Sequence, residues 1–317
     1  MQVLSIGKKK RVYAVAFSPD GGELAAVSGD RMIRVWDLST GEVRRASSVE
    51  ETSCGYDLAW LDDRRLVFAG TDLSWWDLAA DEWRPIAPGL TWGRRIKASP
   101  GAELLVEVDQ ARSTQWAGPG LIVRPTADWS IQPAAPESAN TTGGVAFNGD
   151  GTLLATGHIA VVGQRTRSIA GIPAFQFQQN EYDYLVHVRE MPAGRVLQTI
   201  DGWQQAVTHL AFSPDGSVLA GTAGPRLRVW NLNENRELAC HKRGPKHFQG
   251  LSFAHDGRFL AAVSNDATAR VWETQGWREH TTFTWQIGSL LNIAFAPDGL
   301  RAAAGSDRGQ IVIWDVE

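Results

Sequence analysis

Apolar and polar residues alternate along this chain in short runs separated by turn residues. A typical unit begins with an alternating apolar run, a Pro-Asp-Gly turn and a second run rich in Ala, Val and Leu. A short polar turn follows, and then a third run that ends in Trp, as in Arg34-Val-Trp-Asp-Leu38. Short strands with turn signals about every ten residues are typical of antiparallel sheets. The pattern therefore predicts an all-β protein.

The unit repeats along the chain. Ala-Phe-Ser-Pro-Asp-Gly stands at 16–21 and again at 211–216, with variants at 146–151, 252–257 and 294–299. Two degenerate copies, at 59–63 and 97–101, make seven. The spacings between their anchor residues 17, 60, 98, 147, 212, 253 and 295 are 43, 38, 49, 65, 41 and 42. The third-strand pattern recurs at 74–78, 228–232, 270–273 and 312–315. Such a period is the signature of a repeat architecture.

These motifs resemble the WD-repeat (WD-40) family, whose repeats of about 40–45 residues each build one four-stranded propeller blade. The resemblance covers essentially the whole chain and marks a divergent member. It implies a seven-bladed β-propeller of four-stranded antiparallel blades, with residues 1–317 as a single domain.

The two ends of the chain are expected to close the ring. Only three residues follow Trp314, so the last blade lacks a fourth strand. Residues 2–6 supply it by comparison with 195–200, the fourth strand of blade 4. Because 22 residues follow Phe295 and the first anchor is Phe17, joining the ends gives a spacing of 39. Pairing of the amino terminus into the last blade removes an exposed sheet edge.

Two features depart from the family pattern. Family blades commonly carry a Gly-His pair nine residues before the anchor, but those positions hold Lys8, Trp203 and Gln286 in the best-aligned copies. Blades 3 and 4 carry Arg124 and Arg189 where the third-strand Trp is expected. The buried polar network of the family therefore cannot form intact. Drift in a divergent propeller is the favoured interpretation, and use of the freed rim positions by a partner is the alternative.

A net charge of −4, from 31 basic and 35 acidic residues, conceals two unlike faces. In this architecture the loops between blades share a top face with the turns between second and third strands. The blade-to-blade loops carry nine cations against four acids, whereas the bottom turns are acidic. An acidic peptide or polyanion would be steered to the top face. The nine cations are Lys8, Lys9, Lys10, Arg11, Arg94, Arg95, Lys242, Arg243 and Lys246.

Aromatic residues and long loops are expected on the same face. Of the 14 Trp residues, Trp92, Trp116, Trp203 and Trp285 fall in loops on this side. The loops between the second and third strands are long in blade 3, over 109–120, and in blade 4, over 157–183. The latter carries Phe175 and Phe177 and is either a binding loop or a self-packed hairpin extension. Arg and aromatic residues are enriched in interface hot spots.

We therefore expect a rigid, non-catalytic scaffold that binds a protein or acidic peptide through its basic and aromatic top face. Closed blades supply stiffness and loops supply specificity. Nucleic-acid or polyanion binding by the same face is the first alternative. The predicted partner-binding residues are Lys8, Lys9, Lys10, Arg11, Trp92, Arg94, Arg95, Trp116, Phe175, Phe177, Trp203, Lys242, Arg243 and Trp285.

Catalytic motifs are missing from the sequence. The seven His residues form no His-x-x-x-His pair, and Cys54 and Cys240 form no Cys-x-x-Cys pair or expected disulfide. We expect no catalytic residue, metal or cofactor, although a metal-assisted hydrolase in the central channel is a second alternative and a sensor portion of a larger signalling system a third. With no apolar run of about 18 residues and no secretory signal, a cytoplasmic monomer without a membrane partner is predicted.

Overall fold

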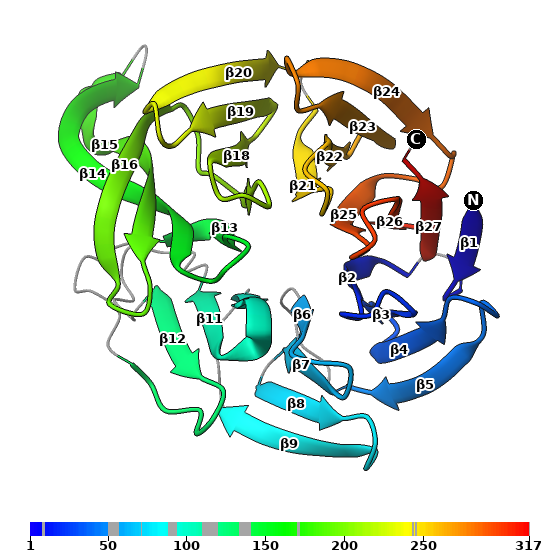
Figure 1. Ribbon diagram of the computed structural model, residues 1–317. Coiled ribbons are helices and arrows are strands. Elements are labelled where there is room, and N and C mark those ends of the chain that lie inside the picture. Colours follow the sequence, from blue (N-terminus) through cyan, green and yellow to red (C-terminus); the bar gives the residue numbers. More distant parts are fainter. Residues whose placement is uncertain are drawn as a thin grey trace.

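Seven antiparallel sheets stand around a central axis in the computed structural model (Figure 1). The structure describes residues 1–7, 10–49, 57–70, 72–87, 94–109, 120–132, 141–169, 172–242, 244 and 246–316. For residues 94, 109, 165–169 and 172–179, which lie in strands, it describes the backbone only. The predicted seven-bladed β-propeller is confirmed.

The first three blades follow one another along the chain, and each is a meander from the axis outward. In blade 3 the described chain shows three strands and a single bridge between Val123 and Gln132. Blade 1 consists of β2 (Val12–Phe17), β3 (Glu23–Ser28), β4 (Met32–Asp37) and β5 (Val43–Ser48). Blade 2 consists of β6 (Asp57–Trp60), β7 (Arg65–Ala69), β8 (Leu73–Asp77) and β9 (Glu82–Ala87), and blade 3 of β10 (Arg94–Ala98), β11 (Leu104–Asp109) and β12 (Leu121–Pro125).

The other four blades each have four strands. Blade 4 consists of β13 (Thr141–Phe147), β14 (Leu153–Ile169), β15 (Ile172–Glu190) and β16 (Arg195–Trp203). Blade 5 consists of β17 (His209–Phe212), β18 (Val218–Ala223), β19 (Arg226–Asn231) and β20 (Arg236–Lys242). Blade 6 consists of β21 (Phe248–Phe253), β22 (Phe259–Ser264), β23 (Thr268–Glu273) and β24 (Arg278–Thr284), and blade 7 of β25 (Leu290–Phe295), β26 (Arg301–Ser306), β27 (Gln310–Asp315) and β1 (Gln2–Ser5).

The ring is closed by the amino-terminal strand, as predicted. In β1, Gln2 pairs with Ile313 and Ser5 with Gln310, so residues from both ends of the chain share one sheet. The side chain of Leu4 is 5% exposed and belongs to the core cluster between blades 7 and 1. The first strands of neighbouring blades are in contact around the whole circle, from β2 through β25 and back to β2. Burial of Leu4 and the added strand pairing both stabilise the closed ring.

Apolar side chains are buried mainly between adjacent sheets. The third-strand Trp36, Trp76, Trp272 and Trp314 are each at most 3% exposed. The indole N–H of Trp60 donates to the carbonyl of Ala16 in the neighbouring blade, at 3.1 Å. In contrast, the indole N–H groups of Trp272 and Trp314 have no hydrogen-bond partner among the residues that the structure describes.

Blade 4 carries a long β-hairpin in place of a loop. β14 and β15 pair from Leu153 and Glu190 out to Ile169 and Ile172. The pairing of β13 with β14 ends at His158, and that of β16 with β15 ends at Tyr184. Beyond those residues the described backbone is a two-stranded ribbon. The described backbone of the 157–183 insertion is therefore a β-hairpin. The side chains of Phe175 and Phe177, on which the choice between a binding loop and a self-packed extension depends, lie outside the described part.

Candidate functional site

Strand direction defines the two faces of the ring. The amide of Gly29, in the turn after β3, donates to the carbonyl of Arg11, in the loop before β2, at 2.8 Å. The amide of Phe248 likewise donates to the carbonyl of Gly224 at 3.0 Å. Blade-to-blade loops and second-to-third strand turns therefore share the top face. On the bottom face, the amide of Leu38 donates to the carbonyl of Gly22 at 3.0 Å.

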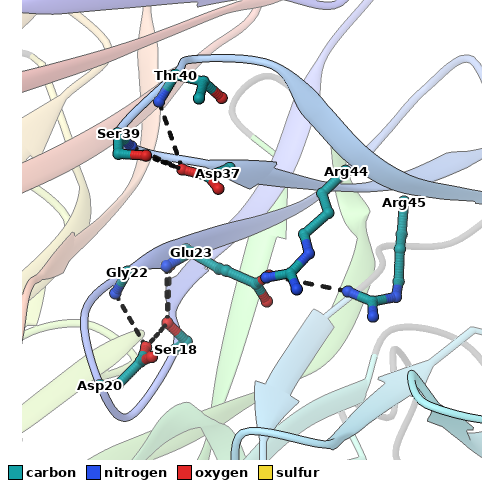
Figure 2. A network of polar contacts seen from close by, with 9 residues as sticks. All are labelled: Ser18, Asp20, Gly22, Glu23, Asp37, Ser39, Thr40, Arg44 and Arg45. Atoms are coloured by element: carbon teal, nitrogen blue, oxygen red, sulfur yellow. Dashed lines mark hydrogen bonds and ion pairs between the residues drawn. The ribbon is translucent and has the colours of Figure 1, made fainter.

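Acidic residues of the bottom face are engaged within their own turns, as Figure 2 shows for blade 1. Asp20 accepts hydrogen bonds from the Ser18 hydroxyl at 2.6 Å and from the Gly22 amide at 2.9 Å. The bond from Ser18 is the main cause of the lowered pKa of Asp20. Glu23 accepts from Arg44 at 2.6 Å. The same Asp turn recurs at Asp150, Asp215, Asp256 and Asp298, which confirms these residues as turn formers.

The predicted top-face cations have two different positions. Lys10, Arg11 and Lys242 are exposed on the top face. The prediction that Arg94 and Arg95 lie in a blade-to-blade loop is wrong, because both belong to β10, the innermost strand of blade 3. Arg95 lines the central channel. Lys8, Lys9, Trp92, Trp116 and Arg243 lie outside the described residues, and the side chains of Arg94, Phe175 and Phe177 do as well.

Two predicted partner-binding tryptophans pack within the ring. Trp203 is the last residue of β16 rather than a loop residue, and it is 7% exposed. The guanidinium of Arg228 lies over its ring at 4.7 Å. Trp285 is half-buried, with its ring centroid 5.5 Å from that of Phe283 and 4.7 Å from that of Trp314. Both tryptophans therefore pack against neighbouring side chains and leave little of their own surface for a partner.

The structure brings Trp203 and Lys242 together in a groove between blades 4 and 5, which we call the blade 4–5 groove. Its volume is about 340 Å³, and Arg226, Arg228 and Glu237 also line it. Arg228 is held by Glu237 at 2.7 Å and by the carbonyl of Asp201 at 2.9 Å.

Arg226 and Lys242 carry the free charge of this groove. They are directly opposite each other in the β19–β20 ladder, and neither forms an ion pair with any residue in the described ranges. Like charges that face each other across a ladder are destabilising. An anion bound between Arg226 and Lys242 would therefore relieve their mutual repulsion. Arg226 was missed by sequence reasoning, although its position at the start of a third strand, opposite a fourth-strand Lys, was a usable signal.

The described residues contain no group of three or more His, Cys, Asp or Glu side chains arranged to hold a metal ion. No described helix is long and apolar enough to cross a membrane. Cys240, at the edge of the blade 4–5 groove, is a free thiol, while Cys54 lies outside the described residues.

Comparison with known proteins agrees with the geometry. The family described as "WD domain, G-beta repeat" matches residues 1–37, 194–231, 233–273 and 277–315. The mouse protein "Target of rapamycin complex subunit LST8" is 24% identical over 139 residues, which are 43% of this chain and 43% of that protein. "WD repeat-containing protein VIP3" of Arabidopsis thaliana is 28% identical over 137 residues, 38% of this chain and 43% of the relative.

A third relative, "Transcription initiation factor TFIID subunit 5" of Caenorhabditis elegans, is 31% identical over 106 residues, 33% of this chain and 16% of its own length. The chain thus spans less than half the length of these curated relatives. Repeats of this family are generally non-catalytic and typically serve as protein-interaction scaffolds. Four repeats of this chain, in blades 1, 5, 6 and 7, match the WD40-repeat family, and the closed ring of seven blades is the β-propeller that such repeats build.

Proposed function

We propose that this propeller is a non-catalytic scaffold that binds an acidic segment of a protein partner on its top face. The blade 4–5 groove is the observation that carries the proposal, because it presents Arg226 and Lys242 without an acidic partner in the described chain. A carboxylate-bearing segment would satisfy both cations by charge-assisted hydrogen bonds.

The groove is preorganised for such a segment. Arg228 is fixed by its ion pair with Glu237 and lies between the rings of Trp203 and Trp230, at 4.7 and 5.3 Å from their centroids. A wall that is already ordered loses little conformational freedom when a partner binds, which favours affinity. Trp203 thus serves binding through Arg228 rather than by its own exposed surface.

Other cations of the top face add to its positive charge. Lys10 and Arg11 are exposed on this face, and we propose that Lys8, Lys9 and Arg243 act with them. Trp92, Trp116, Phe175 and Phe177 stay in the proposal as aromatic contacts beside the basic residues. Long-range attraction by these charges would raise the association rate of an acidic partner.

The names of two relatives agree with a role in assembly. LST8 is named as a subunit of the target of rapamycin complex, and the Caenorhabditis elegans relative as a subunit of TFIID. By analogy, we propose that this chain joins a protein complex through its top face. We further propose that it acts in the cytoplasm and is itself monomeric.

Charge reversal in the groove, with a matched reversal on the bottom face, tests the proposal. The top variant is Arg226→Glu with Lys242→Glu, and the control is Arg236→Glu with Arg278→Glu, two exposed residues at the starts of fourth strands. Both change the net charge by −4. Partners would be identified by affinity purification with crosslinking, and the purified partner would then be titrated against each variant.

The top variant should bind the partner at least about tenfold more weakly, whereas the control should match wild type. A partner retained fully by the top variant would refute the proposed surface. Nucleic-acid fragments serve as the alternative ligand in the same titration. Binding of those fragments that weakens steeply with salt, together with no acidic protein partner, would favour the nucleic-acid alternative.

A further inference from the structure

The axis of the propeller carries a second cationic site, separate from the blade 4–5 groove. A cavity of about 80 Å³ at the axis is lined by first-strand residues or their immediate neighbours from all seven blades. Asp57, Arg95, Lys97 and His209 are its titratable members. Arg95 and Lys97 both come from β10, where residues two apart point to the same side of the strand.

Comparison of the seven first strands shows how unusual Lys97 is. Blade 3 holds Lys97 at the position one residue before the anchor, and every other blade holds a small side chain there. These are Ala16, Ala59, Ala146, Ala211, Ser252 and Ala294. Blade 3 therefore differs from the other six blades in carrying a long cationic side chain at this position, and Lys97 lines the cavity together with Arg95.

Two cations face a single acid, Asp57, in this cavity. Arg95 is half-buried and Lys97 exposed, and neither forms an ion pair within the described chain. Asp57 is nearby, but its carboxylate accepts hydrogen bonds from the backbone amides of Leu58 at 3.0 Å and Ile96 at 3.1 Å. The acid thus ties blade 2 to blade 3 rather than pairing with either cation.

His209 lies on the same cavity and adds no positive charge. Its Nδ1 is 3.0 Å from the Thr208 hydroxyl and 3.2 Å from that of Thr222, and its Nε2 has no described partner. Burial, and then the charges of Arg95 and Lys97, hold the pKa of His209 well below its usual value. Its ring is therefore neutral at neutral pH, and it lies close enough to both cations for their charges to disfavour its protonated form.

We propose that Arg95 and Lys97 hold a compact oxyanion, a phosphate or carboxylate group, in the central channel. The cavity, at about 80 Å³, has room for such a group. The anion is either a free small molecule or the acidic side chain of a bound segment. This site goes beyond the proposed function, because it shares no lining residue with the blade 4–5 groove.

Titration calorimetry on the full chain tests the site with inorganic phosphate and with acetate. The variants are Lys97→Ala, which installs the residue of five other blades, and Arg95→Asn, which installs the equivalent of Asn292 in blade 7. Since other blades already accommodate these residues, both variants should fold, and their thermal unfolding would be checked. Arg278→Ala, at an exposed position on the bottom face, is the control.

Wild type should bind at least one of the two anions, and each channel variant should bind it about tenfold more weakly. The control should stay within twofold of wild type. Absence of binding by wild type, or equal affinities in wild type and Lys97→Ala, would overturn the site. An equal loss in the Arg278→Ala control would also overturn it, since the effect would then be one of net charge.

A hexaglutamate peptide distinguishes the two sources of the anion. Displacement of phosphate by the peptide in wild type would assign the site to the side chain of a bound segment. Phosphate binding that the peptide leaves unchanged would assign it to a free small anion. Because partner binding by the Arg226→Glu, Lys242→Glu variant is measured separately, failure of the channel site leaves the groove proposal standing, and the reverse also holds.

Discussion

Blades 1, 5, 6 and 7 differ from blades 3 and 4 in what lies at one core position. The third strands of the first group carry Trp36, Trp230, Trp272 and Trp314, and these four blades are also the ones that the family repeat matches. Blades 3 and 4 carry Arg124 and Arg189 at that position. An indole fills this space with apolar contacts, whereas a guanidinium in the same place must find polar partners.

Each arginine finds its partners in a different way. Arg124 forms a buried ion pair with Glu107 and donates to the carbonyl of Trp129 at 2.9 Å. Arg189, 2% exposed, donates to the carbonyl of Gly194 at 3.2 Å and lies 3.1 Å from Nδ1 of His187. The propeller thus tolerates a buried charge at this position when the blade supplies polar groups to match. The turns and the strand pairing, which blades 3 and 4 keep, therefore maintain the blade without the tryptophan.

The largest expected effect tests ring closure, which joins blades 7 and 1, two of the four blades that keep the tryptophan and that we call regular blades. Deleting residues 1–5 removes β1 and exposes the core around Leu4, so unfolding should be easier by about 3 kcal/mol or more. Urea unfolding of the truncated chain measures this. Leu4→Ala should lose part of that stability, about 2–4 kcal/mol, whereas Val3→Ala should lose little, because Val3 is 45% exposed. An unchanged midpoint in the truncated chain would contradict closure by β1.

The next effect tests the buried ion pair of blade 3. Glu107→Ala would leave Arg124 buried without its carboxylate, and unfolding should become easier by about 3–5 kcal/mol. Adding Arg124→Trp gives the residue of the regular blades and should restore most of the loss. The measurement is urea unfolding of the single and double variants. A double variant as unstable as Glu107→Ala alone would show that blade 3 cannot accommodate a tryptophan at this position.

Blade 4 should make the ring sensitive to acid. His158 is 3% exposed, and its ring lies against that of His187, with centroids 4.4 Å apart and the planes tilted by 32°. Burial first, and then His187 and Arg189, lower the pKa of His158 to about 3 from its usual 6.5. Below pH 6.5 the unfolded chain therefore binds the proton while the folded chain does not. Stability is complete above that pH and is lost progressively towards pH 3, by at most about 1.4 kcal/mol per pH unit.

Urea unfolding at pH 7.5 and 5.0 measures this loss. His158→Ser installs the residue that blades 1, 6 and 7 hold at this position, as Ser28, Ser264 and Ser306. The difference in stability between the two pH values should shrink by about 2 kcal/mol in this variant. His255→Ser, at an exposed position, is the control and should leave the difference unchanged. An equal pH dependence in wild type and His158→Ser would contradict the assignment.

Local turn chemistry explains why the blade count and ring closure could be predicted from the sequence. Gly21 and Gly216 follow the Asp of their turns and have φ of 73° and 71°, which favours glycine. Such turns depend only on adjacent residues, so the repeat remains visible even where the rest of a blade has diverged. The number of such repeats then gives the number of blades, and their spacing shows that each repeat has the length of one blade.

The candidate site could be predicted only in part, because it depends on contacts between residues far apart in the sequence. Arg95 was assigned to a loop because the blade 3 anchor is Ala98 rather than an aromatic residue, and so the start of β10 carried no signal. The burial of Trp203 depends on Arg228, and the packing of Trp285 depends on Trp314. A periodic pattern indicates which face a residue occupies, but it does not say which side chain of another strand covers it.

The smallest expected effect concerns the ribbon that distinguishes blade 4 from every regular blade. Replacing residues 162–181 by Asn-Gly would join Val161 and Tyr182, which are directly paired, through a two-residue hairpin turn. Val161 and Tyr182 are 48% and 41% exposed, and a two-stranded ribbon adds little stability alone, so unfolding free energy should change by less than about 1 kcal/mol. Thermal unfolding of the shortened chain measures it. A loss as large as that of Glu107→Ala would mean that the ribbon packs on the ring as a structural element. Unchanged stability with loss of the crosslinked partner would instead make the ribbon part of the binding surface.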